Sequence, residues 1–395
     1  MSKTILVLAA STYQLDAIRT AKRLGYRVIT TDNIPDNPGH VLADRSFAAD
    51  TTDSKAVAAI ARAECISGII SPCTDVAVPT AAHVAAELGL PGVPLHAARV
   101  LTNKGAFRRF LREQGLPVPQ YHVIGPEAQT PRLDWQSGFW VVKPDFSSGS
   151  KGIFVVRDEE ELTMRMPESR AFSPSGTVVL EQYIQGHQAT CEGVLANGRV
   201  MLSVILDRQT ASLPYVVTTG HHLPTRLPPS ALQRFRMTVE SVCAALGVQN
   251  GPFDCDFVCS QDEVFILEMT PRLGGNSISQ LLRIATGFDL VEYAVHHACG
   301  ADCSLPKQLR VHPSAVVLLG TDSSGKLNYD EGEFSTLCNE SWVHSLTMDV
   351  PVGAPVEKFI NGRHRVGEGY ITADSRDMLE ERVTEFRRRL ALRGN

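Results

Sequence analysis

Short apolar runs alternate with helix-spaced apolar residues in the first hundred positions, and this alternation constrains the fold more than any other feature. Ile5–Ala9 is a continuous apolar run, which is typical of a strand buried on both faces of a parallel sheet. Apolar residues then recur at helical spacing from Leu15 to Leu24, and Gly25 stands where a helix C-cap belongs. The pattern repeats in two further strands and two further helices, at Val28–Thr31, Gly68–Ser71, Ala56–Ala63 and Val76–Leu88. We therefore predict a Rossmann-like N-terminal domain over residues 1–94.

The loop after the first predicted strand lacks the glycine pattern of dinucleotide-binding folds. Ala9-Ala10-Ser11-Thr12 stands where Gly-x-Gly-x-x-Gly belongs. Glycines are needed there so that the backbone can approach a pyrophosphate closely. The sequence therefore disfavours a dinucleotide cofactor.

The pattern of apolar and turn-forming residues changes after the turn cluster at residues 89–94, which we take as a domain boundary. Helical patterns fill Ala97–Gln114, and short β-rich runs separated by glycine-rich turns begin near Phe139. We predict a mixed α/β and α+β fold beyond this boundary.

Composition excludes several classes of protein. The net charge is −5 without a basic block, so a nucleic-acid partner is not expected. The early apolar run is far too short to cross a membrane. The nine cysteines are odd in number and scattered through apolar segments, which favours reduced, buried thiols over disulfides or a zinc site. We expect a cytoplasmic protein.

A loop of small residues follows Lys143, which ends a predicted strand. The loop runs Asp145-Phe146-Ser147-Ser148-Gly149-Ser150-Lys151-Gly152. Glycine and serine leave room for backbone N–H groups to approach phosphate oxygens, and a lysine can neutralise them. A plain hairpin with a surface lysine is an equally good interpretation of this loop alone.

Two acidic residues, Asp256 and Glu268, lie on predicted strands at Phe253–Cys259 and Glu263–Met269. A hairpin of these strands would place the two carboxylates side by side, where they repel unless a hard cation such as Mg²⁺ lies between them. Arg272 follows closely and suits an anionic, transferring phosphoryl group. The alternative is an exposed network of ion pairs.

In order, these motifs resemble the ATP-grasp superfamily, in the branch of biotin carboxylase, carbamoyl phosphate synthase and L-amino acid ligases. The resemblance rests on five motifs, which occur in the order and at the approximate spacing of that family. They are Lys104, Lys143-Pro-x4-Gly-x-x-Gly, Glu181-Gln-Tyr-Ile-x-Gly, Asp256, and Glu268-x-x-Pro-Arg-x-Gly-Gly-Asn. The likeness runs over roughly residues 1–300, and the C-terminal part also resembles that branch. It implies an ATP-grasp N-terminal part at 95–190 with a lid at about 120–182, an ATP-grasp C-terminal part with the metal site at 191–300, and a C-terminal mixed part at 301–395.

The resemblance implies roles for nucleotide-binding residues. Lys104 and Lys143 would hold the phosphates of ATP, under a mobile flap made of Ser147, Ser148, Gly149, Ser150 and Gly152. Glu181 and the backbone of Gln182 and Ile184 would read adenine. Gln188 replaces the glutamate that binds the ribose in this family, and its amide can still form hydrogen bonds.

The resemblance also implies a metal site and a reaction. Asp256 and Glu268 would bind Mg²⁺ or Mn²⁺, with two ions expected. Thr270 stands where many members have an asparagine ligand, so Asn276 is a candidate substitute. Arg272 would stabilise an acyl phosphate, formed from a carboxylate and ATP before an amine attacks it. Related folds commonly form homodimers.

Two positions in the predicted substrate pocket keep alternative interpretations. His221, in the run Gly220-His221-His222, could orient substrate or accept a proton, or it could be structural. Asp75 follows a predicted strand at the edge where α/β sheets bind ligands. It could meet a substrate amine, or it could cap the next helix.

Three functions fit these motifs. We favour an ATP-dependent carboxylate–amine ligase that releases ADP and phosphate. A bicarbonate-activating carboxylase or carbamoyl-phosphate-type enzyme is the second, although no carrier segment lies in this chain. The third is a non-catalytic nucleotide-binding regulator, which would not need Lys143, Asp256, Glu268 and Arg272 together.

Overall fold

A computed structural model describes residues 3–261 and 263–395 of the protein. The N-terminal part is built on a four-stranded parallel sheet. Its order is β3-β2-β1-β4, the order of the first strands of a doubly wound sheet. The strands are β1 (Thr4–Leu8), β2 (Arg27–Asp32), β3 (Arg45–Ala48) and β4 (Gly68–Ile70). The helices are α1 (Leu15–Arg23), α2 (Pro38–Leu42), α3 (Ser54–Ala63) and α4 (Val78–Leu88). The predicted parallel strands are confirmed, and β3 is added at an edge.

An eight-stranded sheet forms the centre of the molecule, in the order β13-β12-β9-β10-β11-β14-β18-β16. Its first five strands in chain order are β9 (His187–Ala196), β10 (Arg199–Thr210), β11 (Thr218–Leu223), β12 (Gly251–Ser260) and β13 (Glu263–Thr270). The others are β14 (Ser314–Leu319), β16 (Val343–Met348) and β18 (Gly367–Thr372). The proposed boundaries at 190 and 300 therefore divide one sheet, and the first of them falls inside β9.

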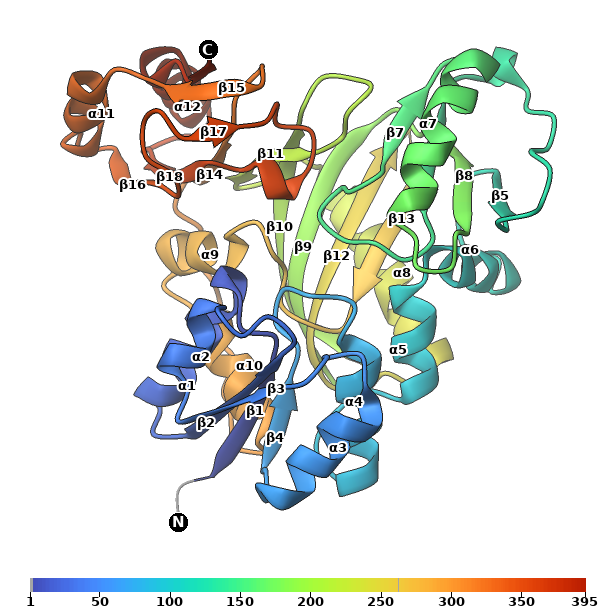
Figure 1. Cartoon of the computed structure of the whole chain (residues 1–395), viewed down its shortest axis with the longest axis vertical. Coiled ribbons are helices and arrows are strands. Elements are labelled where there is room, and N and C mark those ends of the chain that lie inside the picture. The colour runs from blue at the N-terminus through green and yellow to red at the C-terminus, as the bar shows by residue number, and fades with distance from the viewer. Residues whose placement is uncertain (1–2, 262) are drawn as a thin grey trace.

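A smaller antiparallel sheet covers residues 121–182, where we placed the lid. Its order is β5-β8-β6-β7, and α7 (Glu159–Ala171) packs on it. The strands are β5 (Tyr121–Ile124), β6 (Trp140–Pro144), β7 (Phe154–Val156) and β8 (Val178–Gln182). Figure 1 shows this sheet at the upper right, the N-terminal sheet below and the C-terminal strands at the upper left, around the long central strands.

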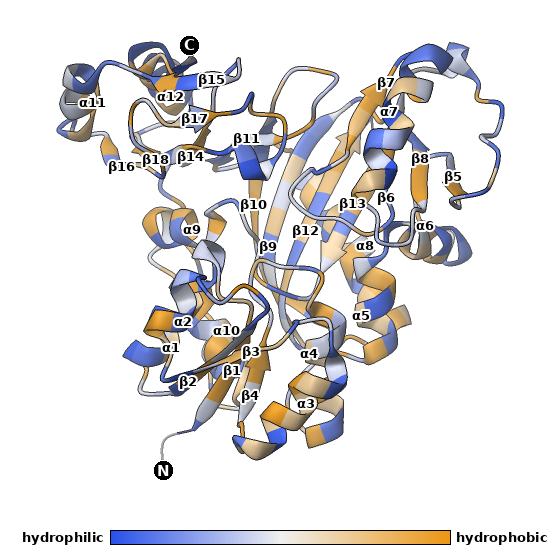
Figure 2. Cartoon of the chain, in the orientation of Figure 1, coloured by the Kyte–Doolittle hydropathy of each residue, from blue (hydrophilic) through white to orange (hydrophobic). Residues whose placement is uncertain are grey.

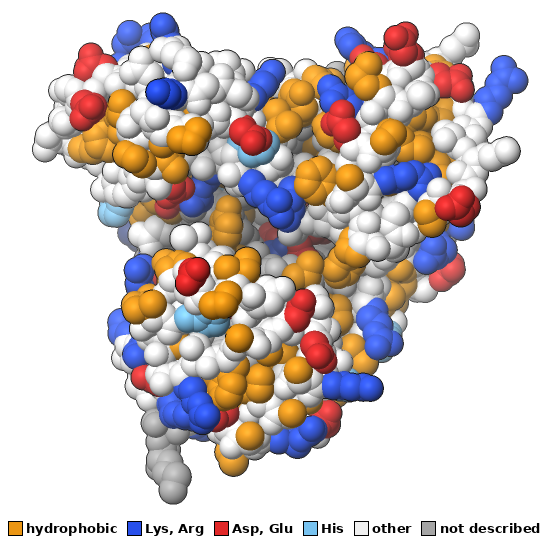
Figure 3. Space-filling view, in the orientation of Figure 1, with side chains coloured by type: hydrophobic (Ala, Val, Ile, Leu, Met, Phe, Trp, Pro, Cys, Tyr) orange, Lys and Arg blue, Asp and Glu red, His pale blue; other side chains and the backbone are white. Residues whose placement is uncertain are grey.

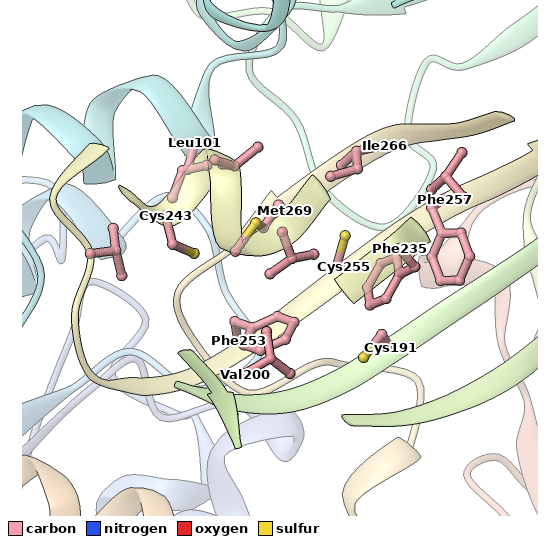
Figure 4. Close-up of a cluster of buried hydrophobic side chains, with 14 of the residues drawn as sticks. Leu101, Cys191, Val200, Phe235, Cys243, Phe253, Cys255, Phe257, Ile266 and Met269 are labelled. Atoms are coloured by element: carbon pink, nitrogen blue, oxygen red, sulfur yellow. The ribbon is translucent and has the colours of Figure 1, made fainter. Parts of the chain in front are cut away.

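The main hydrophobic core lies between one face of the central sheet and three helices. They are α5 (Leu95–Thr102), α6 (Lys104–Glu113) and α8 (Pro229–Leu246). Phe235 of α8 stacks on Phe257 of β12, with ring centroids 4.2 Å apart (Figure 4). Cys191, Cys243 and Cys255 fill the same core as free thiols, as predicted. Cys65 and Cys338 are also free but exposed, contrary to the expectation of burial.

The opposite face of the central sheet packs on α9 (Ile278–Thr286) and α10 (Leu290–Ala298). A fourth sheet joins β15 (Gly325–Asn328), β17 (Pro355–Val356) and β19 (Arg393–Gly394) near α11 (Glu331–Cys338) and α12 (Arg376–Leu390). Short 3₁₀ turns occur at Thr12–Gln14, Trp135–Ser137 and Gly362–His364. Figure 2 shows apolar residues concentrated on the strands and on one side of many helices. None of the described helices is long and apolar enough to cross a membrane.

Candidate active site

A cleft of about 570 Å³ opens where the N-terminal sheet, the central sheet and the lid sheet meet. Figure 3 shows this hollow at the centre of the molecule, with acidic and basic side chains inside it. The cleft is lined by every predicted site residue except Gly152 and His221. Those that line it are Lys104, Lys143, Ser147, Ser148, Gly149, Ser150, Glu181, Gln182, Ile184, Gln188, Asp256, Glu268, Arg272 and Asn276.

The two predicted metal ligands lie directly opposite each other on β12 and β13. Asp256 pairs with Glu268 in register, and cross-strand partners project from the same face. The hydroxyl of Thr190 donates to Asp256 at 2.5 Å, and Lys104 Nζ lies 3.2 Å from Glu268 Oε2. Burial opposes ionisation of Glu268, but Lys104 and Arg272 outweigh it and lower the pKa of this carboxyl. Both groups are therefore available as oxygen ligands facing the cleft.

Lys143 belongs to a buried charge network that the sequence analysis missed. Arg108 is fully buried and donates from Nε to Glu181 Oε2 at 2.7 Å, while Lys143 Nζ donates to Glu181 Oε1 at 2.5 Å. Burial opposes ionisation of Glu181, but Arg108 and Lys143 lower its pKa to about 2. Burial also lowers the pKa of Lys143 to about 8, an effect that Glu181 partly offsets. A signal for Arg108 existed, because it follows Lys104 by one helical turn on α6.

This network changes the predicted adenine site. The carboxylate of Glu181 is held by Lys143 and Arg108, so it is not free to bind a base. The N–H of Gln182 already donates to Gln120 O at 2.8 Å. The side chain of Glu181 and the N–H of Gln182 are therefore used within the fold, so the prediction that they read adenine needs correction. Gln182 and Ile184 both line the cleft, and adenine binding by their remaining backbone groups stays a prediction.

The loop at 147–152 lies between Lys104 and the C-terminal part of the chain. Lys104 Nζ donates to Ser147 O at 2.7 Å, and the N–H of Gly362 donates to Gly149 O at 2.9 Å. Gly152 does not face the cleft; with φ +71°, it packs where a Cβ atom would lie 2.8 Å from Phe172. The loop thus touches both sides of the cleft mouth.

Arg272 joins the N-terminal and central sheets. Its Nε and Nη2 donate to Asp75 Oδ1 at 2.9 and 2.6 Å, and its Nη1 donates to Asp254 Oδ2 at 2.8 Å. Burial raises the pKa of Asp254 to about 7, although Arg272 opposes the shift. Asp75 does not cap α4, since the described N-cap is Ala77 and no side chain caps this helix. Of the two interpretations of Asp75, the ligand-facing one fits the structure.

The structure does not place His221 on the cleft. Its cross-strand partner is Arg208, which lines the cleft, but His221 is only 1% exposed beneath that surface. Neither ring nitrogen has a hydrogen-bond partner among the described residues, and burial lowers the pKa of His221 to about 3. A proton acceptor must reach its substrate, so this geometry argues against the predicted catalytic role. His222 lies on the other face and contacts Glu380 at 3.0 Å.

Residues 138–280 match the family model of the ATP-grasp domain. This chain carries an ATP-grasp domain. The predicted resemblance to ATP-grasp ligases is confirmed, and the matched segment contains the lysine loop, the carboxylate pair and Arg272. Three further residues lie outside the matched segment, and the folding of the chain brings them to the site. They are Lys104, Asp75 and Arg108.

Relatives at low identity cover most of the chain. A formate-dependent phosphoribosylglycinamide formyltransferase from Salmonella schwarzengrund is 26% identical, over 99% of this chain and 96% of that protein. One from Thioalkalivibrio sulfidiphilus is 27% identical, over 81% and 82%. The uncharacterized protein y4rH of Sinorhizobium fredii is 26% identical over 78% of this chain, which spans 64% of that protein's length.

Solved structures share the whole fold. An L-amino acid ligase from Bacillus licheniformis superposes with a TM-score of 0.83 at 20% identity, over 99% of this chain and 98% of that one. A phosphoribosylglycinamide synthetase from Anaerococcus prevotii gives 0.76 at 19% identity over the full length of both chains. At these identities the comparison shows the fold, and the reaction is a separate question.

Proposed function

We propose that this ATP-grasp protein is a carboxylate–amine ligase, which forms an amide through an acyl phosphate and releases ADP and phosphate. The observation that carries the proposal is the joining of three groups in one cleft. Phosphate-binding cations lie at one end, the Asp256–Glu268 pair follows, and the Asp75–Arg272–Asp254 group lies beyond it. A nucleotide-binding regulator would need only the first of these groups.

Lys104 and Lys143 suit the phosphates of ATP. Both are almost fully buried cations that line the cleft, and Lys104 also holds the loop at Ser147. A transferring phosphoryl group carries charge on its outer oxygens, and fixed cations stabilise that charge without reorganisation. These lysines would therefore contribute to binding and to the transition state.

Asp256 and Glu268 fit a magnesium ion bound together with ATP. Mg²⁺ is usually held by one or two carboxylates and completes its shell with phosphates and water. In the described part of the chain, no group of three or more acidic, histidine or cysteine side chains is arranged to hold a metal ion by itself. Asn276 lines the same cleft and could add an oxygen. When bound, the ion would supply positive charge at the terminal phosphate.

The chemical step follows from this arrangement. An oxygen of the substrate carboxylate attacks the γ-phosphorus, the bond to ADP breaks, and an acyl phosphate forms. The amine nitrogen then attacks the acyl carbon, and phosphate leaves with the carbon–oxygen bond electrons and takes up the proton that the nitrogen loses. The main contribution of the protein is to align the reactants and balance their charge.

The loop at 147–152 would keep water away from the acyl phosphate. Its contact between Gly149 O and Gly362 N closes one side of the cleft against the C-terminal part. Exclusion of water prevents hydrolysis of a reactive intermediate. The names of the relatives agree with such a reaction, since one is a formate-dependent formyltransferase and another an L-amino acid ligase.

The proposal is tested with carboxylates labelled with ¹⁸O, ATP, Mg²⁺ and a panel of amines. We expect ADP as the nucleotide product and one label per turnover in the released phosphate, because the attacking oxygen stays bonded to phosphorus. AMP and pyrophosphate as products would contradict the acyl-phosphate route. ATP consumption that no carboxylate stimulates would contradict the ligase assignment itself.

A further inference from the structure

Carboxylates outnumber cations at the end of the cleft next to the N-terminal sheet. Asp75 and Asp254 both line the cleft and share one guanidinium, that of Arg272. A third carboxylate, Glu192, pairs in register with Asp254 on the neighbouring strand and is fully buried. The ion pairs with Arg272 therefore leave an excess of acidic groups around this point.

The hydrogen-bonding capacity of this group is not used up within the described part of the chain. Arg272 occupies Oδ1 of Asp75 and Oδ2 of Asp254, whereas Asp75 Oδ2 and Asp254 Oδ1 are buried without a partner. Buried polar atoms are normally paired, so atoms left over in a cleft indicate a missing group.

Thr270 gives an independent observation directly beneath this part of the cleft, which it does not itself line. It lies directly opposite Asp254 on the adjacent strand, so both side chains project from one face of the sheet. It is only 1% exposed, and its hydroxyl has no partner among the described residues. The uncharged side chain of Thr270 thus adds a hydroxyl oxygen that can accept a hydrogen bond beside the carboxylates.

Local packing holds these acceptors together. The N–H of Gly274 donates to Glu192 Oε1 at 2.7 Å. A Cβ atom at position 274 would lie 1.9 Å from that oxygen and 3.0 Å from Asp254 Oδ1, so only glycine fits. The loop after Arg272 therefore closes tightly over the acidic residues.

We propose that Asp75, Asp254 and Thr270 form a subsite for the primary ammonium group of a substrate. An ammonium group has three N–H donors and no acceptor, which matches two carboxylate oxygens and one hydroxyl oxygen. Arg272 keeps the two carboxylates from moving apart and is a positioning residue here. This inference rests on the proposed ligase function, in which one of two substrates carries the group: either the activated acid carries it, or the amine binds as its ammonium ion and gives one proton to Asp75 or Asp254 before its nitrogen attacks.

Wild-type protein and Asp75→Asn are compared in a hydroxylamine trap, which converts an acyl phosphate into a hydroxamate without the amine substrate. Pairs of amino acids and their α-hydroxy acid isosteres serve as donors. If the acid carries the ammonium group, we expect wild type to prefer the amino acid at least about 10-fold in kcat/KM, and the variant to lose that preference.

If the amine carries the group, hydroxamate formation should be unchanged in Asp75→Asn, while the KM for the amine rises at least about 10-fold. Thr270→Val, which removes a hydroxyl and no charge, should give the same pattern with a smaller change. Asp289→Asn is the matched control, since Asp289 pairs with Arg283 away from the cleft. This variant should leave both the preference for the amino acid and the KM for the amine unchanged.

A purely structural role of Asp75 would lower the rates with charged and neutral isosteres equally, and that result would overturn the subsite. Calorimetry with a non-hydrolysable ATP analogue adds a readout without turnover. Equal affinity of wild type for ammonium compounds and their alcohol isosteres would also overturn it. Absence of hydroxamate with every acid, together with tighter ammonium binding, would instead contradict the ligase function and retain the subsite.

Discussion

The two ends of the cleft are both built from buried charges, but the charges are balanced in opposite ways. At the lid end, Arg108 and Lys143 enclose the single carboxylate of Glu181, which leaves a net positive charge. At the N-terminal end, Asp75 and Asp254 share the single cation of Arg272, so carboxyl groups outnumber cations there, and burial raises the pKa of Asp254 to about 7. The first end suits an anionic phosphate, whereas a bound cation at the second end would favour the ionised form of its carboxyl groups.

The two ends also differ in how fully their hydrogen bonds are satisfied. Arg108 donates to Glu181 and to the backbone oxygens of Ile266 and Leu267, so each nitrogen of this guanidinium has a partner without a ligand. Asp75, Asp254 and Thr270 retain buried acceptors without described partners. A satisfied network fixes geometry in advance, whereas an unsatisfied one gains stability when a ligand supplies the missing donors. The comparison predicts that the lid end is rigid and that the other end is ordered by substrate.

The largest effect is expected at Glu268, where the two ends meet. Glu268→Gln removes one anionic ligand beside Lys104, and it should lower kcat at least about 100-fold, or about 2.7 kcal/mol of transition-state stabilisation. Phosphate release with saturating acid, ATP and Mg²⁺ measures this effect. An unchanged melting temperature serves as the folding control. Wild-type phosphate release by the variant would remove Glu268 from the metal site.

Lys143→Ala tests the positive end alone. It should raise the KM for ATP and lower kcat together, for a combined loss of about 10- to 100-fold in kcat/KM, because the charge acts in both bound and transition states. Glu181 keeps Arg108 as a partner in this variant, so the fold should persist. Calorimetry that shows unchanged nucleotide binding would place Lys143 outside the phosphate site.

The pH dependence of ATP binding should sharpen the comparison. Only protonated Lys143 attracts phosphate, and burial lowers its pKa to about 8, so affinity should fall as the pH rises through that value. Glu181 favours the protonated lysine, and Glu181→Gln should therefore move this fall to lower pH. Calorimetric titration between about pH 7 and about pH 9.5 measures the shift. An identical pH profile in the variant would show that another group controls ATP binding.

The smallest effect is expected in the loop at 147–152. Its small residues bury little apolar surface, so its amides should exchange hydrogen quickly without nucleotide and several-fold more slowly with an ATP analogue. Mass spectrometry of a peptide that covers the loop measures this, with β12 as an internal reference of slow exchange. Equal protection of the loop in both states would contradict a moving flap.

Local sequence patterns determined much of the architecture. The alternation of apolar runs and helical spacing indicated the parallel N-terminal strands, and period-two patterns indicated the hairpin that pairs Asp256 with Glu268. Strand β3 was not predicted, because three of its four residues are exposed at a sheet edge and form no apolar pattern. The sequence also did not predict that one sheet extends across residues 190 and 300, since strand pairing between distant segments leaves no local signal.

In the candidate site, the sequence determined which residue types occur and on which elements, because periodicity and loop composition are local properties. Only the tertiary structure decided their partners. It directed Glu181 to Arg108, Asp75 to Arg272 rather than to α4, and buried His221 beneath the cleft. The physical reason is that burial and charge pairing depend on contacts between segments far apart in the chain. Asp75 and Arg272, for example, are 197 residues apart.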